Sequence, residues 1–247
     1  MCRSALLTSL LAYLNPGGKI PDNDQEKWLL FRSLVNVRAP APVCADFLQA
    51  QDMLLQEMIA DKGITDASAL KPVRADICLW KGDITTLKAD AIVNAANSQM
   101  LGCFYPCHTC IDNAIHTFAG VQLRLACAQL VDGPVPVGQV IMTSAYNLPS
   151  RYILHTVGPF IAGQPTQADC LLLARCYRTC LEKAKASGLR SIAFCCISTG
   201  EFHFPQKKAA EIAVHTIGDN PGIRVIFTVF TDTDYQIYHQ LLNSATF

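Results

Sequence analysis

The sequence predicts an α/β protein: a three-layer domain with a largely parallel sheet of about six strands, preceded by a helical N-terminal segment. Three observations lead to this prediction. From residue 73 onward, short apolar runs alternate with helix-length stretches, which is typical of helices packed on both faces of a buried sheet. The first 72 residues instead show helical spacing interrupted by turns. Finally, 51% of the 247 residues are hydrophobic and only 16% are charged, which is enough apolar material for a sizeable core.

The N-terminal segment, residues 1–72, is expected to be a helical extension. Leu6, Leu10 and Leu14 recur at helical spacing, and the sequence Asn15-Pro16-Gly17-Gly18 that follows is a turn, not a small-residue cleavage site. We therefore interpret residues 5–14 as a surface helix, not as a signal peptide. Two more helices are predicted, over residues 28–34 and 45–59. A proline at position 72 marks the boundary to the second unit, residues 73–247.

The second unit carries the predicted sheet. Its strands are expected at residues 77–80, 91–95, 139–142, 152–157, 191–197 and 224–230, and its helices at residues 111–130, 167–186, 207–217 and 234–242. In such sheets ligands bind beyond the carboxyl ends of the strands. The loops that follow the strands are therefore the places to search for a site.

Charge and composition exclude several function classes. Twenty Lys and Arg residues balance twenty Asp and Glu residues, so the basic excess of a nucleic-acid-binding protein is missing. No run of 18 apolar residues predicts a membrane span. The chain has twelve cysteines, which we interpret as mostly small buried apolar residues in a reducing cytoplasm. Seven are expected in the core: Cys78, Cys127, Cys170, Cys176, Cys180, Cys195 and Cys196.

Three loops after predicted strands contain residues suited to chemistry. They are Gly82-Asp83-Ile84-Thr85, the stretch from Val93 to Asp112, and the stretch from Ile197 to Pro205, which includes Ser198-Thr199-Gly200-Glu201-Phe202. Glycine-containing loops that lead into helices can present backbone N–H groups to a phosphate. Serine and threonine there can equally serve as helix caps, so each loop alone is a weak signal.

Taken together and in this order, the loops resemble those of the macrodomain family. The resemblance extends from about residue 76 to residue 235 and includes Val93-Asn94-Ala95-Ala96-Asn97, His155-Thr156-Val157-Gly158-Pro159 and Ile197-Ser198-Thr199-Gly200. It implies binding of ADP-ribose. Asp83 would then bind the adenine amine beside the backbone of Ile84, Phe230 would lie against the adenine, and Asn97 would hold the distal ribose. The diphosphate would be enclosed by Ser198, Thr199, Gly200, Glu201 and Phe202.

One departure from the common family pattern is informative. Hydrolytic macrodomains usually have a glycine run after Asn-Ala-Ala-Asn, whereas here Leu101-Gly102 leads into a segment with three cysteines and a histidine, residues 103–110. This segment resembles the zinc-dependent branch of the family, in which the loop ligates a catalytic zinc. Cys103, His108 and Cys110 would hold one Zn²⁺ and leave a coordination position open. Two alternatives remain: a closed site with Cys107 as fourth ligand, or no metal.

Other polar residues have both functional and structural interpretations. Asp112 matches an aspartate that hydrolytic relatives place near the distal ribose, but it is also suited to cap a helix beginning at Asn113. Glu201 is expected either to be solvated or to position water or substrate, and His203 to line the site. His116 and His155 are expected to serve in packing.

The resemblance implies a zinc-dependent hydrolase that removes mono-ADP-ribose from protein side chains, with Asn97 and Asp112 as catalytic residues. The alternative is a reader that binds ADP-ribose without hydrolysis and uses zinc only to shape its loop. Kinship further suggests a substrate modified by a sirtuin-class transferase, such as a lipoyl-carrier protein. No nucleic-acid or membrane partner is expected.

Overall fold

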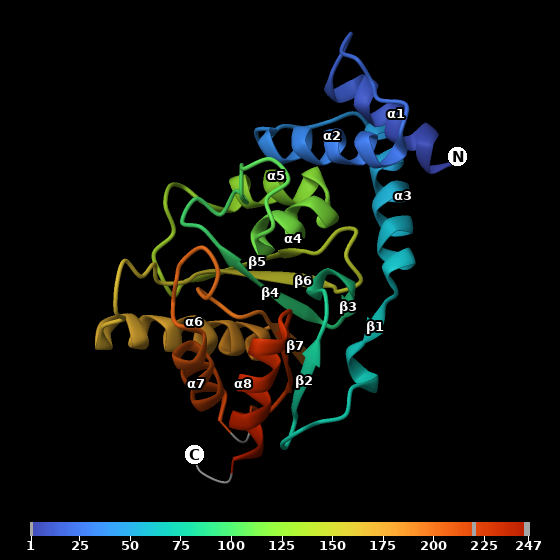
Figure 1. Ribbon diagram of the computed structural model, residues 1–247. Helices are drawn as coiled ribbons and strands as arrows, with labels where there is room; N and C mark the ends of the chain where they lie inside the picture. Colours follow the sequence, from blue (N-terminus) through green and yellow to red (C-terminus); the bar gives the residue numbers. More distant parts are fainter. Residues whose placement is uncertain (1, 219–220, 245–247) are drawn as a thin grey trace.

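The computed structural model describes residues 2–218 and 221–244 and confirms the three-layer α/β expectation (Figure 1). A six-stranded sheet lies between α4 and α5 on one face and α6, α7 and α8 on the other. The strands are β2 (Ile77–Lys81), β4 (Ala91–Ala96), β5 (Val140–Ser144), β6 (Tyr152–Val157), β7 (Ser191–Phe194) and β8 (Arg224–Val229). The helices are α4 (Ile111–Ala119), α5 (Val121–Leu130), α6 (Gln167–Ala186), α7 (Gln206–Ile217) and α8 (Asp232–Asn243).

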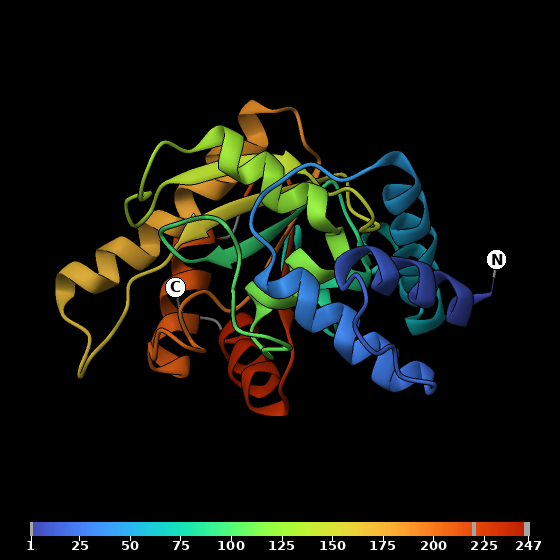
Figure 2. The same cartoon turned by 90° about the horizontal axis from the view of Figure 1, so that it is seen from above.

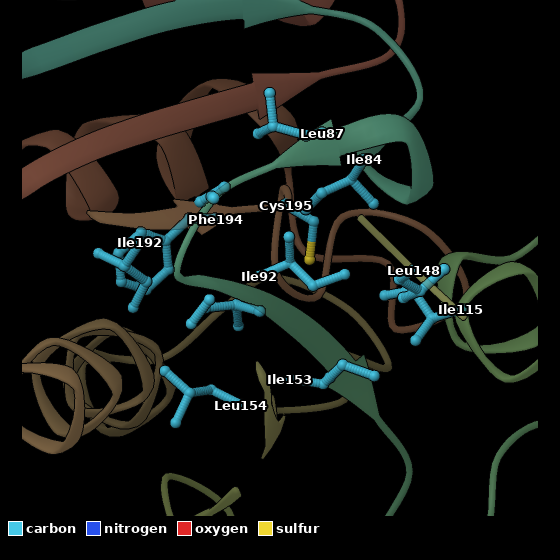
Figure 3. Packing of buried hydrophobic residues seen from close by; sticks show 14 of the residues in the cluster. Ile84, Leu87, Ile92, Ile115, Leu148, Ile153, Leu154, Ile192, Phe194 and Cys195 are labelled. Atoms are coloured by element: carbon cyan, nitrogen blue, oxygen red, sulfur yellow. The ribbon is translucent and has the colours of Figure 1, made fainter. Parts of the chain in front are cut away.

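The strand order is β2-β8-β7-β4-β6-β5, and only the β5–β6 pairing is antiparallel. The carboxyl ends of β2, β8, β7, β4 and β6 therefore all lie along one edge of the sheet. Buried side chains from the sheet and its flanking segments form the core, among them Ile92, Ile153 and Phe194 (Figure 3). This arrangement places the loops after β2, β7 and β4 next to one another in space.

The N-terminal segment folds into α1 (Arg3–Leu14), α2 (Asp24–Val37) and α3 (Ala45–Lys62), which lie together beside α4 (Figures 1 and 2). Leu11, Phe31 and Leu54 are fully buried and belong to the same apolar cluster as the side chains under the sheet. The N-terminal helices thus share a continuous core with the α/β unit. None of the helices in the described part of the chain is long and apolar enough to cross a membrane.

Several local predictions differ from the structure. The helix expected over residues 111–130 is broken at Gly120, whose φ of 99° lies in the left-handed region, and a Cβ there would meet the side chains of Gln51 and Gln122 at 2.6 Å. A two-residue parallel pair, β1 (Thr65–Asp66) with β3 (Leu87–Lys88), and two 3₁₀ turns, η1 (Ala67–Ala69) and η2 (Ile84–Thr86), were not predicted, because such short elements have no periodicity. Cys170 and Cys196 are half-buried and not core residues.

We expect Phe31→Ala to lower the free energy of unfolding by about 3–5 kcal/mol, because a fully buried aromatic side chain is lost from the core shared by α2 and the sheet. Leu29→Ala is the matched control on the same helix. Leu29 is 46% exposed, so its truncation should change stability by about 0.5 kcal/mol or less. Urea unfolding measures both. Equal losses for the two variants would contradict a shared core.

Candidate active site

The loop after β2 places Asp83 at one end of the sheet edge. The Asp83 side chain caps the 3₁₀ turn η2: its Oδ1 accepts hydrogen bonds from the backbone N–H (3.0 Å) and hydroxyl (2.6 Å) of Thr85. Its Oδ2 accepts a hydrogen bond of 2.9 Å from Lys62 Nζ at the end of α3. Partial burial raises the pKa of Asp83, but these donors outweigh burial and hold the pKa below its usual value. Asp83 is therefore an ionised acceptor at neutral pH.

Phe230 directly follows β8, the neighbour of β2, and it is 76% exposed. The backbone N–H of Gly82 donates to the carbonyl of Val229 at 3.0 Å, which ties the Asp83 loop to the end of β8. Ile84, by contrast, is buried. An exposed aromatic ring beside an ionised acceptor offers both an apolar surface and a hydrogen-bonding partner to a flat, amine-bearing ligand.

The loop after β7 folds into turns that leave backbone donors free. His203 N–H donates to the Gly200 carbonyl, and Phe204 N–H donates to the Ser198 carbonyl, both at 2.9 Å. Among the described residues, no hydrogen bond uses the N–H groups of Gly200, Glu201 or Phe202. Consecutive N–H groups of this kind are suited to bind an anion such as a phosphate.

Ser198 adopts a left-handed conformation, with φ 67°, and its hydroxyl is buried without a hydrogen-bond partner among the described residues. The loop packs closely against the end of β6, because a Cβ at Gly158 would lie only 2.0 Å from Ser198 Oγ. A non-glycine residue in this conformation is uncommon and concentrates at functional sites. Glycine at position 158 is what permits the close approach of the two loops.

The loop after β4 places Asn97 above Asp112. Asn97 Nδ2 donates to the Gly102 carbonyl at 3.1 Å and lies 3.4 Å from Asp112 Oδ2. Asp112 Oδ1 accepts a hydrogen bond of 2.8 Å from Asn94 Nδ2. The Asp112 side chain is buried, which raises its pKa to about 6. Asp112 therefore supports Asn97 from inside the protein. It does not cap α4: Cys110 does so, because its sulfur accepts a hydrogen bond from the Asn113 N–H at 3.4 Å.

Cys103, His108 and Cys110 converge in the segment between β4 and α4. Their ligand atoms all lie within 4.8 Å of one another, and Cys103 Sγ is 3.6 Å from His108 Nδ1. In a tetrahedral zinc site, neighbouring sulfur and nitrogen ligands lie about 3.5 Å apart. Two thiols and one imidazole at these separations therefore fit a zinc ion with one position left open. Burial raises the pKa of the Cys110 thiol to about 12, so a metal would have to displace its proton.

Cys107 does not join this group. Its φ of 53° turns the side chain toward α2, where the thiol donates to the Leu29 carbonyl at 3.4 Å. The geometry of the described residues thus assembles three soft ligands, not four.

Glu201 links the loop after β7 to this cluster, because its Oε1 lies 3.5 Å from His108 Nε2. With Nδ1 facing Cys103 and Nε2 facing a carboxylate, the His108 ring has the arrangement common for metal-bound histidines. His203 lies farther along the same loop and stacks edge-on with Phe160, their ring centroids 5.8 Å apart.

A second group, His116, Cys127 and His155, is buried next to Asp112, whose Oδ1 lies 3.6 Å from His116 Nε2. Both ring nitrogens of His155 already have neighbours: Nδ1 lies 3.1 Å from Asn94 Nδ2, and Nε2 lies 3.0 Å from Thr143 Oγ1. Burial lowers the pKa of His155 to about 3 and that of His116 well below its usual value. Burial therefore keeps both histidines neutral, and among the described residues neither ring nitrogen of His116 has a hydrogen-bond partner.

Three residues that contact the site come from the N-terminal segment, where sequence analysis expected no site residues. Lys62 binds Asp83, Arg32 donates to the His108 carbonyl at 2.7 Å, and Asn36 accepts from the Cys107 N–H at 2.9 Å. No motif marks them in the sequence, because a single Lys, Arg or Asn on a helix is ordinary. Only Arg32 lies within a helix predicted from the sequence, residues 28–34, whereas Asn36 and Lys62 lie just beyond the ends of the predicted helices.

Read along the sheet edge, the loops form a linear series. Asp83 and Phe230 follow β2 and β8, the Ser198–Phe202 loop follows β7, and Asn97 with the three soft ligands follows β4. This series offers an aromatic and acceptor end, a middle suited to phosphates, and a polar end beside potential metal ligands. A nucleoside diphosphate joined to a second sugar has the same linear order of groups.

Comparisons with known proteins agree with this geometry. A family model described as Macro domain matches residues 93–213. A protein-ADP-ribose hydrolase of Treponema medium is 51% identical over 256 residues, covering 98% of both chains, and one of Staphylococcus aureus (strain Mu50) is 48% identical, covering 91% of this chain and 88% of its own.

Two solved structures are also similar. The Oceanobacillus iheyensis macrodomain with ADP is 40% identical, with a TM-score of 0.61, and the match covers 67% of this chain and 89% of that one. The Trypanosoma brucei macrodomain in complex with ADP-ribose is 30% identical, with a TM-score of 0.66, and the match covers 86% of this chain and 95% of that one. The fold, the order of the loops and these relatives together show that the chain belongs to the macrodomain family.

Proposed function

We propose that this protein is a zinc-dependent hydrolase that removes mono-ADP-ribose from modified protein side chains. The observation that carries the proposal is the convergence of Cys103, His108 and Cys110 next to Asn97, at the end of the loop series. The relatives named protein-ADP-ribose hydrolase, which match nearly the whole chain, support the hydrolase class. The zinc requirement rests on the donor set and its geometry.

ADP-ribose would bind along the series of loops. Asp83 would accept from the adenine amine beside the Ile84 backbone, and Phe230 would cover the adenine ring. The free N–H groups of the Ser198–Phe202 loop, which comprises Ser198, Thr199, Gly200, Glu201 and Phe202, would bind the diphosphate. Asn97 would hold the distal ribose, and the buried Asp112 would orient the Asn97 amide.

Hydrolysis breaks the bond between the anomeric carbon of the distal ribose and the protein side chain. Water supplies a hydroxyl to the ribose and a proton to the side chain that leaves. When bound by Cys103, His108 and Cys110, zinc supplies Lewis acidity beside this bond. The chain's own residues hold the substrate: the adenine and phosphate contacts fix its position, and Asn97 sets the orientation of the reacting sugar.

We propose, from the resemblance to the zinc-dependent branch of the family, that the substrate is a lipoyl-carrier protein modified by a sirtuin-class transferase. Glu201, which is exposed and lies 3.5 Å from His108 Nε2, would be available to contact the modified side chain. We further propose that the protein acts in the cytoplasm, in agreement with its twelve unpaired cysteines.

Cys103→Ala, His108→Ala and Cys110→Ala are each expected to lose bound zinc and hydrolysis, because each leaves a two-ligand site. Cys107→Ala is the matched control in the same loop, since its thiol faces the Leu29 carbonyl, and it should retain both properties. Elemental analysis and release of ADP-ribose from a mono-ADP-ribosylated protein measure the two effects. Loss of zinc in Cys107→Ala with retention in Cys103→Ala would show that the ligands are assigned wrongly.

Asp83→Ala should weaken ADP-ribose binding about tenfold to a hundredfold, the effect of losing a charged hydrogen bond of about 1.5–3 kcal/mol. Turnover at saturating substrate should be nearly unchanged, because the adenine lies far from the bond that breaks. Asp66→Ala is a close control: Asp66 also caps a 3₁₀ turn and pairs with a lysine, Lys88, but lies outside the loop series. Calorimetry showing equal affinities for the two variants would refute the adenine contact.

Removal of the metal should separate binding from hydrolysis. The adenine and diphosphate contacts come from Asp83 and the Ser198–Phe202 loop, neither of which supplies a metal ligand, so chelated protein should still bind ADP-ribose. Hydrolysis should stop and then return when zinc is added back. Full turnover by protein verified to be metal-free would reduce the metal to a structural role. Binding without any turnover in the zinc-loaded protein would favour the reader alternative.

A further inference from the structure

Residues 103–110, here called the cysteine loop, have little structure of their own. The one backbone hydrogen bond within the loop, among the described residues, runs from His108 N–H to the Tyr105 carbonyl at 3.3 Å. Cys107 in addition holds a left-handed conformation, which is unfavourable for a residue with a Cβ. Contacts from outside the loop must therefore hold its shape.

Arg32 on α2 supplies one such contact at the C-terminal end of the loop. Its Nη2 donates to the His108 carbonyl at 2.7 Å and to Asn113 Oδ1 at 2.9 Å. Asn113 in turn donates from Nδ2 to the Tyr105 carbonyl at 3.0 Å and from its backbone to Cys110 Sγ at 3.4 Å. The Arg32 guanidinium thus links the His108 backbone to Asn113, whose own N–H contacts the Cys110 sulfur.

Asn36 lies one helical turn farther along α2 and is 1% exposed. Its Oδ1 accepts from the Cys107 N–H at 2.9 Å, and its Nδ2 donates to Thr117 Oγ1 on α4, also at 2.9 Å. The Leu29 carbonyl, on the same helix, accepts from the Cys107 thiol. Arg32 and Asn36 therefore hold the backbone of His108 and Cys107, which lie between the outer ligands Cys103 and Cys110.

We propose that α2 is a positioning element of the zinc site, with Arg32 and Asn36 as positioning residues that hold the cysteine loop in its metal-binding shape before metal arrives. This inference rests on the proposed function. Pre-ordering of the loop removes part of the conformational entropy cost of bringing three ligands together, which raises metal affinity. The N-terminal segment is then a functional part of the active site, although it supplies no ligand.

The first test compares Arg32→Gln with Arg3→Gln in the full-length chain. Both remove an arginine charge from the N-terminal segment, but Arg3 pairs with Glu57 and Asp61 at the surface and does not touch the loop. Competition with a chromophoric chelator should show zinc affinity about 10–100-fold weaker in Arg32→Gln and unchanged in Arg3→Gln. Arg32→Lys should recover part of the loss, because it keeps a charged donor, and ADP-ribose affinity of the zinc-free proteins should be the same in all.

The second test needs no metal. In zinc-free protein, Asn36→Ala should speed hydrogen exchange at the Cys107 amide, because that N–H loses its acceptor. Thr117→Val is the matched control: it removes the same Asn36–Thr117 bond but leaves the bond to Cys107. Exchange followed by NMR should therefore be fast in Asn36→Ala and slow in Thr117→Val.

The outcomes separate the two proposals. Wild-type protein that binds no zinc would overturn the zinc requirement of the proposed function and, with it, the positioning role. Normal zinc binding that is equally strong in Arg32→Gln would overturn the positioning role alone. Unchanged exchange at Cys107 in Asn36→Ala would likewise show that α2 does not order the loop.

Discussion

The active-site candidate depends on the parallel alignment of β2, β8, β7 and β4. Because these strands run in one direction, their carboxyl ends meet at one edge, and four loops that are far apart in the sequence become neighbours. Strand order then sets the order of chemistry along the edge: Asp83 and Phe230, then the Ser198–Phe202 loop, then Asn97 and the cysteine loop. A ligand with an adenine at one end and a ribose at the other can match this series only if the strand order is kept.

Burial under the edge determines how the polar groups behave. Asp83 is ionised because Thr85 and Lys62 donate to it, whereas Asp112 is enclosed and has a raised pKa. Next to Asp112, His116 and His155 are held neutral by burial. Asn97 therefore rests on a buried carboxyl group whose pKa is raised, whereas the carboxylate at the far end of the series, Asp83, has a lowered pKa. Two carboxylates of one protein thus have different protonation properties because their surroundings differ.

The N-terminal helices add hydrogen bonds to both ends of the site, at Asp83 and at the cysteine loop. Their apolar residues share the core with the sheet, which fixes α2 and α3 against the domain. With that packing in place, Lys62 reaches Asp83, and Arg32 and Asn36 reach the cysteine loop. An irregular loop gains its shape here from long-range hydrogen bonds, since it cannot satisfy its backbone by regular secondary structure. The same packing that stabilises the fold therefore also organises the loop that carries the soft ligands.

The sequence by itself determined the α/β class, the strand positions to within a few residues, and the residues of each loop, because periodicity and loop motifs are local signals. It did not reveal the break at Gly120, the orientation of Cys107 or the roles of Lys62, Arg32 and Asn36. The tertiary structure decided these, since each depends on a partner in a distant segment: Gln51 beside Gly120, α2 beside the cysteine loop, and α3 beside Asp83. Local patterns specify which groups are present, but contacts between distant segments decide which of them meet.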